Sequence, residues 1–370
     1  MLTVQELAAL AARHDGVRTL SAYIGLPPAS PPGVARTLLR QGIARLREGL
    51  SVATHVERTA FDACCDRLLA RVDSVQAPAA GATWVGIASA DGATYDEWLP
   101  AVVPTTFAWE ERLRVAPYLA AIVRHGALVT VADRQHAALF RYENDALAAV
   151  DQWETRPSIA AGEHTGHMSA LPRVGFHRGT GGLPGADAAD RQSDNAVERH
   201  LSGLIDRISS LRRGGDWLVL SGASEFVARL ASALERDTNG NMAVGGSLTR
   251  AATPADVRSM AAAAVASLRT AEGERIVEEV VRQPAAPRTA LGAESVSAAL
   301  GQGAVRLLVL SQRSLGDQSA SVEDLVRRAL ATGAEVEFVN GDAGGKLQTA
   351  AGGVAALLRF TPAQGREGES

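Results

Sequence analysis

The stretch LVTVADRQHAALFRYENDALAAVDQW, residues 128 to 153, decides the fold. Its apolar and β-branched residues predict a hairpin of two strands, Leu128 to Ala132 and Ala137 to Tyr142, around the turn Asp133-Arg134-Gln135-His136. A third strand is predicted over Ala146 to Trp153. Three strands in succession favour a sheet as the framework of this part of the chain.

A strongly amphipathic helix is predicted downstream, over Gln192 to Arg213. Its apolar stripe consists of Val197, Leu201, Leu204, Ile205, Ile208 and Leu211. A strand (Trp217 to Ser221), a helix (Glu225 to Glu235) and a short strand (Met242 to Gly245) follow. Three strands, a helix and then strand–helix–strand predict a mixed sheet flanked by helices.

Between the third strand and the long helix lies a loop, residues 156–190, with seven glycines and three prolines. Loops of this length are uncommon in compact domains and are usually functional or disordered. Cationic side chains beside bare backbone N–H groups suit a polyanion such as RNA. The predicted RNA contacts in the loop are Arg173, His177, Arg178, Gly179, Thr180, Gly181 and Gly182. A flexible insert without a partner is the alternative.

Arginines at the helix, among them Arg191 and Arg199, could follow an RNA backbone. They alternate with Asp190, Asp194 and Glu198, so a solvated face of mixed charge is an equal alternative.

The remaining sequence predicts two further α/β domains. In the first, helices are expected over 3–13, 32–50 and 57–75, and strands over 19–26, 82–89 and 95–99. A helix over 118–124 should open the second domain. In the third, helices are expected over 255–268, 272–281, 294–302 and 321–332, and strands over 305–310, 336–339 and 354–360. We expect an N-terminal α+β domain (1–116), a middle domain (117–251), a C-terminal α/β sandwich (252–362) and a disordered tail (363–370).

Composition narrows the functional classes. The net charge is −4 over 370 residues, so any RNA contact must come from local patches. Cys64 and Cys65 are adjacent in a helical pattern and are expected to be buried residues without disulfide or metal roles. Neither a signal peptide nor a membrane-spanning run is evident, so we expect a soluble, cytoplasmic monomer that does not bind membranes.

The order of these pieces resembles the archaeal and eukaryotic class-one peptide release factors and Pelota, and more closely the bacterial branch of that superfamily, the Balon-like ribosome-binding factors. Residues 294–312 and 352–360 resemble the start and the last strand of the family's third domain. The hairpin region 129–145 resembles the opening of its middle domain. The resemblance implies a ribonuclease H-like middle domain and a third domain with the fold of kink-turn-binding ribosomal proteins.

The family's catalytic signature is Gly-Gly-Gln at the tip of the middle-domain loop. Here Gly181-Gly182 is followed by Leu183, and the nearest downstream glutamine is Gln192, at the expected helix start. The run Glu198-Arg199-His200 resembles the basic turn that follows the signature helix, which adds His200 to the predicted RNA contacts.

Three functional hypotheses follow. The resemblance implies a ribosome-associated factor that acts in hibernation or rescue by occupying the A site near the peptidyl-transferase centre, with a translation GTPase as a partner and without a cofactor. The second is a peptidyl-tRNA hydrolase in which Gln192 or loop-held water replaces the missing glutamine. The third is a protein-interaction module without an RNA role.

Metal chemistry has two weak candidates. His164 and His167 have a spacing compatible with zinc, but no cysteine is near to complete a ligand set, and solvated loop histidines are favoured. Asp133 and Asp151 could hold Mg²⁺ on neighbouring strands, but Asp133 sits in a turn, where aspartate is common. No metal site is predicted.

Two further segments are considered as phosphate-binding sites, and a structural role is favoured for each. After the strand 217–221, Ser224 is expected to cap the next helix. The run Gly341 to Lys346 lacks the spacing of a phosphate-binding loop and is expected to be a plain loop between two strands.

Overall fold

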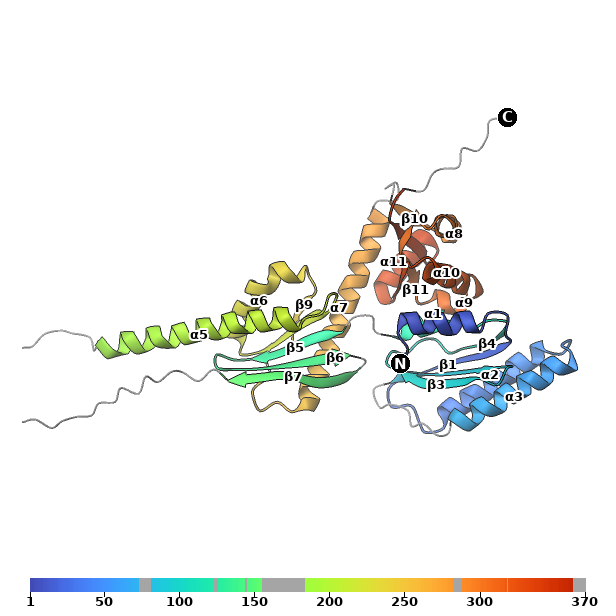
Figure 1. The fold of residues 1–370 in the computed structure, drawn as a ribbon, viewed down its shortest axis with the longest axis horizontal. Coiled ribbons are helices and arrows are strands. Elements are labelled where there is room, and N and C mark those ends of the chain that lie inside the picture. The colour runs from blue at the N-terminus through green and yellow to red at the C-terminus, as the bar shows by residue number, and fades with distance from the viewer. Residues whose placement is uncertain are drawn as a thin grey trace, which may run out of the picture. The chain divides into compact units, whose positions relative to one another are not determined.

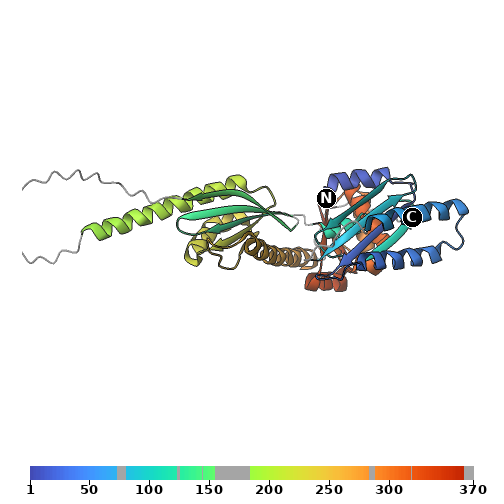
Figure 2. The same cartoon turned by 90° about the horizontal axis from the view of Figure 1, so that it is seen from below.

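The computed structural model describes residues 1–72, 81–122, 126–143, 145–154, 184–282, 288–317 and 319–361, and the side chains of 184–193, 316, 317 and 319 lie outside that description. Helices and strands alternate along the described chain, and the strands form three sheets. The predicted mixed α/β class is therefore confirmed. The chain groups into two compact units, Met1–Arg124 with Arg269–Ser370, and His125–Leu268 (Figures 1 and 2).

The first sheet is antiparallel, in the order β3-β2-β1-β4. Its strands are β1 (Thr19–Leu26), β2 (Ala82–Ser89), β3 (Thr94–Leu99) and β4 (Thr106–Glu110), and its helices are α1 (Val4–Arg13), α2 (Val34–Gly49) and α3 (His55–Val72). Helices α2 and α3 cover one face, where Leu20 and Trp84 pack with Leu39 and Phe61. Only β4 is absent from the sequence prediction for this region.

The other face of this sheet shares one core with elements from the end of the chain. Tyr23 and Ile87 belong to the same buried cluster as Leu308 and Val326. Helix α4 (Ala116–Ala121), all of whose residues are buried, packs in this cluster. The sequence assigned this helix to the second domain, but its side chains lie in the core of the first unit. An entirely apolar segment does not reveal which core it will join.

The C-terminal sheet has the order β10-β13-β11-β12, from β10 (Thr289–Leu291), β11 (Val305–Ser311), β12 (Glu335–Val339) and β13 (Val354–Leu358). The shared core lies on one face, with α8 (Ala293–Gly301), α9 (Ser314–Asp317) and α10 (Ser319–Ala331). Helix α11 (Gly341–Ala351) packs on the other face through Ala343 and Leu347. The expected plain loop over Gly341 to Lys346 is therefore wrong, because this run forms the start of α11.

The second unit carries a five-stranded sheet in the order β7-β6-β5-β8-β9. Its strands are β5 (Ala127–Ala132), β6 (His136–Glu143), β7 (Ala146–Glu154), β8 (Trp217–Gly222) and β9 (Met242–Val244). The first three are antiparallel neighbours, and β8 and β9 continue the sheet parallel to β5. The predicted hairpin and third strand are confirmed, and the arrangement is that of a ribonuclease H-like sheet.

Helices cover both faces of this second sheet. Helices α5 (Pro184–Leu211) and α6 (Ser224–Thr238) pack on one face, against Leu128 and Leu218. The first part of α7 (Pro254–Arg282) packs on the other, where Val257 and Ala261 join the core. The sequence predicted two helices here, but α7 is continuous, and its later residue Val277 belongs to a core of the first unit.

Two smaller expectations concern cysteines and membranes. Cys64 and Cys65 are free and buried, as predicted. Burial raises the pKa of the Cys65 thiol to about 12, so the thiol stays protonated. Among the described helices, none is both long and apolar enough to cross a membrane.

Candidate nucleic-acid interface

The long helix α5 positions the predicted interface. Leu201, Leu204 and Ile208 are buried against the sheet, and Val197, Ile205 and Leu211 pack beside them. The six residues of the predicted apolar stripe are thus confirmed as the packed face. Charged side chains occupy the rest of the helix surface because they cannot be buried without partners.

The backbone shows where the loop is anchored. Strand β7 ends at Glu154 and α5 begins at Pro184, so the segment between them joins a strand end to a helix end. Among the described side chains of α5, Val197 is the first that packs in the core. The preceding residues 184–196 form a helical extension of about 20 Å, at 1.5 Å per residue. Figure 1 shows this part of α5 projecting beyond its sheet.

Most of the predicted RNA contacts fall between the end of β7 and the start of α5. Arg173, His177, Arg178, Gly179, Thr180, Gly181 and Gly182 lie outside the described residues. The same holds for the histidines considered for zinc. Arg191 and Gln192 belong to α5, but their side chains lie outside the description. Because α5 begins at Pro184, Gln192 lies in its third turn and not at its start.

His200 is the clearest correction to the predicted interface. Its side chain is only 2% exposed, and its ring lies 5.7 Å from Trp153 and 5.4 Å from Phe226, between ring centroids. Burial lowers the pKa of His200, which favours the neutral ring. A buried neutral histidine offers neither an exposed edge nor a positive charge to RNA. The spacing of Val197, His200, Leu201 and Leu204 on one helical face could have predicted this.

The exposed arginines of α5 differ in how they are neutralised. Arg207 of α5 pairs with Asp151, and Arg213, two residues after the helix ends, donates to the Glu143 carboxylate at 3.0 Å. Arg199 instead donates from Nε to the carbonyl of Asn195 in its own helix, at 3.2 Å. Among the described residues Arg199 forms no ion pair within 4.0 Å, so its guanidinium keeps most of its five N–H donors. Of the predicted contacts whose side chains the structure describes, Arg199 is the one suited to bind a phosphate.

A shallow concavity of about 370 Å³ lies beside Arg199. Trp153, Gly203 and Arg207 also line it. Trp153 is half-buried, and the missing side chain at Gly203 leaves space on the helix surface. An aromatic face next to an arginine suits an unpaired base with its phosphate. Sequence reasoning missed Trp153, although its position at the end of β7, just before the long loop, was a usable signal.

The structure gives other roles to the residues considered for Mg²⁺. Asp133 accepts hydrogen bonds from the backbone N–H groups of Gln135 and His136, both at 2.8 Å. Burial alone would raise its pKa, but these hydrogen bonds outweigh burial and lower the pKa of Asp133. Asp151 is paired with Arg207. Within the described ranges, no group of three or more His, Cys, Asp or Glu side chains could hold a metal ion.

The turn after β8 is also structural. Ala223, and not the expected Ser224, is the N-cap of α6, and no side chain caps the helix there. The hydroxyl of Ser221 is buried, donates to the carbonyl of Gly246 and accepts from the N–H of Leu248 at 3.2 Å. It thereby ties the segment after β9 to the end of β8.

The chain matches no family model and no curated protein in sequence. Among solved structures, it is similar to S. cerevisiae Dom34, described as a translation termination-like factor that interacts with Hbs1, with 11% identity, 64% of each chain covered and a TM-score of 0.41. An archaeal Pelota, from a model of ribosome-bound Pelota and ABCE1, has 14% identity over 97% of this chain and 94% of that chain, with a TM-score of 0.46.

The archaeal translation termination factor aRF1 has 17% identity over 97% of this chain and 99% of that chain, with a TM-score of 0.26. The chain thus spans slightly less than two thirds of Dom34, as aligned, and nearly all of the two archaeal proteins. All three belong to the group that the sequence resembles.

Proposed function

We propose that this chain is a ribosome-associated translation factor of the release factor and Pelota superfamily. It binds the ribosomal A site, in hibernation or rescue, without hydrolysing peptidyl-tRNA. The segment between β7 and α5 reaches towards the peptidyl-transferase centre, and a translation GTPase is the partner that the resemblance implies. The protein works as a monomer in the cytoplasm.

The observation that carries this proposal is the way the second unit holds its loop. Residues 155–183 are attached at one end beside Trp153 and Arg199, and at the other to a helical extension of about 20 Å. Such an extension separates the start of α5 at Pro184 from the packed part of the helix, which begins at Val197. A factor that must place a loop in a narrow, RNA-lined site needs this separation from its own core.

The residues at the loop favour occupancy over hydrolysis. Leu183 follows Gly181-Gly182, where the family's catalytic signature has glutamine. Gln192, the alternative, lies in the third turn of α5. A residue held in a continuous helix lacks the freedom of a loop tip, and no observation on the described residues favours the hydrolase.

The test is co-sedimentation of the purified chain with 70S ribosomes at low and raised salt. We expect salt-sensitive binding, because phosphate contacts release counterions. Replacing residues 173–185 with a Gly-Ser segment should abolish most of it, and Arg199→Gln should weaken it severalfold. Arg236→Gln is the matched control, because Arg236 is exposed on α6 in the same unit and should leave binding unchanged.

A peptidyl-tRNA hydrolysis assay on the bound complex then separates occupancy from release. We expect no release above the rate of empty ribosomes. Release that is lost on Gln192→Ala would replace our proposal with the hydrolase. No binding at any salt concentration would exclude both ribosome occupancy and peptidyl-tRNA hydrolysis, and would favour a protein-interaction module.

A further inference from the structure

A second concavity in the same unit has no described residue of α5 in its lining and plays no part in the proposed function. It has a volume of about 590 Å³ and is lined by the end of β5, the start of β6, and residues 247–252 after β9. Strands β5, β8 and β9 are parallel, and their carboxyl ends meet here. In open α/β sheets, ligands bind at the carboxyl ends of the strands, in pockets of about this size.

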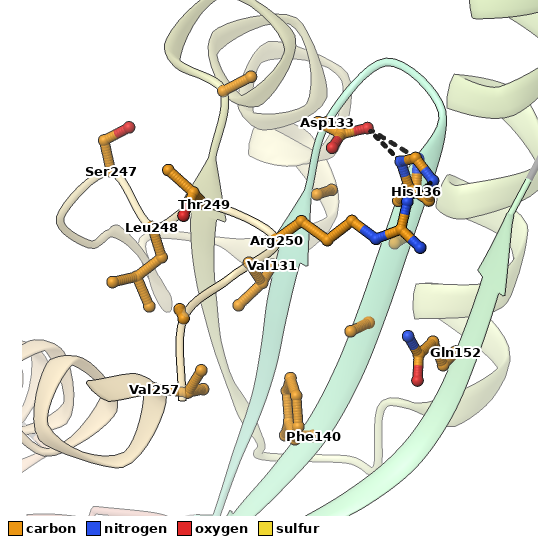
Figure 3. Close-up of a pocket in the computed structure, with 15 residues that line it drawn as sticks. Val131, Asp133, His136, Phe140, Gln152, Ser247, Leu248, Thr249, Arg250 and Val257 are labelled. Atoms are coloured by element: carbon orange, nitrogen blue, oxygen red, sulfur yellow. Dashed lines mark hydrogen bonds and ion pairs between the residues drawn. The ribbon is translucent and has the colours of Figure 1, made fainter. Parts of the chain in front are cut away.

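The wall of this cavity is largely apolar. Val131, Phe140, Leu248 and Val257 line it, and alanines fill the positions between them. Phe140 is only half-buried, so its ring is available to a ligand. In Figure 3, Phe140 and Val131 lie below the extended side chain of Arg250. A half-buried ring in the wall of an apolar pocket suits a planar aromatic body that can stack on it.

Arg250 is held in place by a chain of hydrogen bonds. Asp133, fixed by two backbone N–H groups, lies with Oδ1 3.2 Å from Nδ1 of His136. With the proton on Nδ1, Nε2 of His136 accepts a hydrogen bond from Nη1 of Arg250 at 2.6 Å. Figure 3 shows Arg250 extending from the 247–252 segment to His136. This network fixes the guanidinium beside the cavity.

The guanidinium has capacity left for a ligand. Its contact with His136 uses one of five N–H donors. Among the described residues, Arg250 forms no ion pair within 4.0 Å. A planar fork with free donors binds phosphate oxygens in bidentate fashion. One negative charge lies nearby and repels an anion: Oε1 of Glu154 is 3.1 Å from Nε2 of His136, the atom that Arg250 contacts.

A polar edge completes the site. Gln152 of β7 lines the cavity with an exposed side chain, and its amide offers both donors and an acceptor. Such an amide can pair with the edge of a purine base. Thr249 adds an exposed hydroxyl, whereas the hydroxyl of Ser247 is committed to the carbonyl of Gly222 at 2.8 Å.

We propose that this cavity binds one purine nucleotide unit, with the base against Phe140 and Gln152 and the phosphate at Arg250. A free mononucleotide and an unpaired nucleotide of RNA share this chemistry. The two sites are distinct in their lining, because none of the residues that line this cavity lines the concavity beside Arg199.

The test uses the full chain in calorimetric titrations with AMP, adenosine, inorganic phosphate and a short single-stranded oligoadenylate. We expect AMP to bind, and Arg250→Gln to weaken it about tenfold through loss of charge-assisted hydrogen bonds. Adenosine should bind the wild type and Arg250→Gln alike. Glu154→Gln should tighten AMP binding, because it removes the opposing charge. Arg134→Gln is the matched control. Arg134 lies in the turn that holds Asp133 and His136 but pairs with Glu225, so this substitution should leave AMP affinity unchanged.

The outcomes decide the proposal and the source of the ligand. AMP binding that depends on Arg250 supports a free nucleotide, and oligoadenylate binding with the same dependence but no AMP binding supports RNA. Equal AMP affinity in the wild type and Arg250→Gln overturns the proposal, as does a lack of binding by both AMP and oligoadenylate. Inorganic phosphate that binds as tightly as AMP overturns the role of the base. None of these results bears on co-sedimentation with ribosomes.

Discussion

The carboxylate of Glu323, on α10, accepts the backbone N–H of Val115 at 2.8 Å, although 208 residues separate the two in sequence. Its second oxygen accepts the N–H of Ala116 at 3.0 Å. Glu323 is 1% exposed and lies where the first sheet and the C-terminal elements share a core. This one side chain satisfies two buried donors that α4 cannot satisfy itself. The two ends of the chain are therefore joined in the first unit by a polar contact as well as an apolar one.

Glu323→Gln should destabilise the first unit by about 2 kcal/mol, because an amide can accept from only one of the two N–H groups. Burial raises the pKa of Glu323 above its ordinary value, and the hydrogen bonds from Ala116 and Val115 only partly oppose this. A raised pKa means that the folded state binds the proton more tightly than the unfolded state. The advantage of the wild type over Glu323→Gln should therefore shrink as the pH rises from about 4.5.

Urea unfolding of both proteins across this pH range measures the difference. Asp324→Asn is the control, since its side chain is half-exposed and lies 3.8 Å from Arg328. A wild-type advantage that grows with pH would contradict the assignment.

The same substitution at two helical glycines should have opposite effects. A Cβ at Gly273, within α7, would meet Val339 Cγ1 at 3.4 Å, an ordinary contact. Gly273→Ala should therefore stabilise the chain by about 0.8 kcal/mol through a more restricted unfolded state. A Cβ at Gly42, in α2, would lie 2.4 Å from the Phe107 ring, and Gly42→Ala should cost about 2 kcal/mol. Thermal unfolding of the two variants checks the signs, and equal effects would mean that packing at these sites is looser than described.

The sequence predicted most strands and helices because their apolar periodicity is clear. The hairpin of β5 and β6 and the stripe of α5 are examples, since each buries one face and exposes the other. Helix α11 was missed because three of its first five residues are glycines, which disfavour a helix, whereas packing of Ala343 and Leu347 on the sheet holds it. Here tertiary contacts override local propensity.

The candidate sites were harder to predict for a different reason. Arg199 and His200 are adjacent and both looked cationic, but the helix turns one outward and buries the other. The cavity at Arg250 joins side chains from β6 and β7 with the segment after β9, and neither spacing nor composition brings Gln152 and Arg250 together. Such a site exists only once the sheet has formed.

Buried His200 should make the second unit sensitive to acid. Because burial lowers its pKa in the folded state, the unfolded state binds protons more readily below about pH 6.5. Stability from this group is present above that pH and is lost as the pH falls. His200→Phe removes the titration, so the wild type should lose stability relative to this variant on acidification. His55→Ala, at an exposed histidine of α3, should show no such trend, and thermal melts between neutral and mildly acidic pH distinguish the two.

Asp151→Asn should strengthen ribosome binding, in contrast to Arg199→Gln. Asp151 neutralises Arg207 and places a negative charge in the concavity beside Trp153 and Arg199. Removing that charge frees the Arg207 guanidinium for a phosphate, so affinity should rise severalfold at low salt. The slope of the logarithm of the binding constant against the logarithm of salt concentration should steepen by about one unit, because one more phosphate contact releases one more counterion. Arg199→Gln should flatten the same slope by about one unit. Because Asp151 also orders Arg207, thermal melts must show that the variant remains folded. Unchanged or weaker binding by folded Asp151→Asn would exclude this face of α5 from the contact and leave the 155–183 segment to carry it.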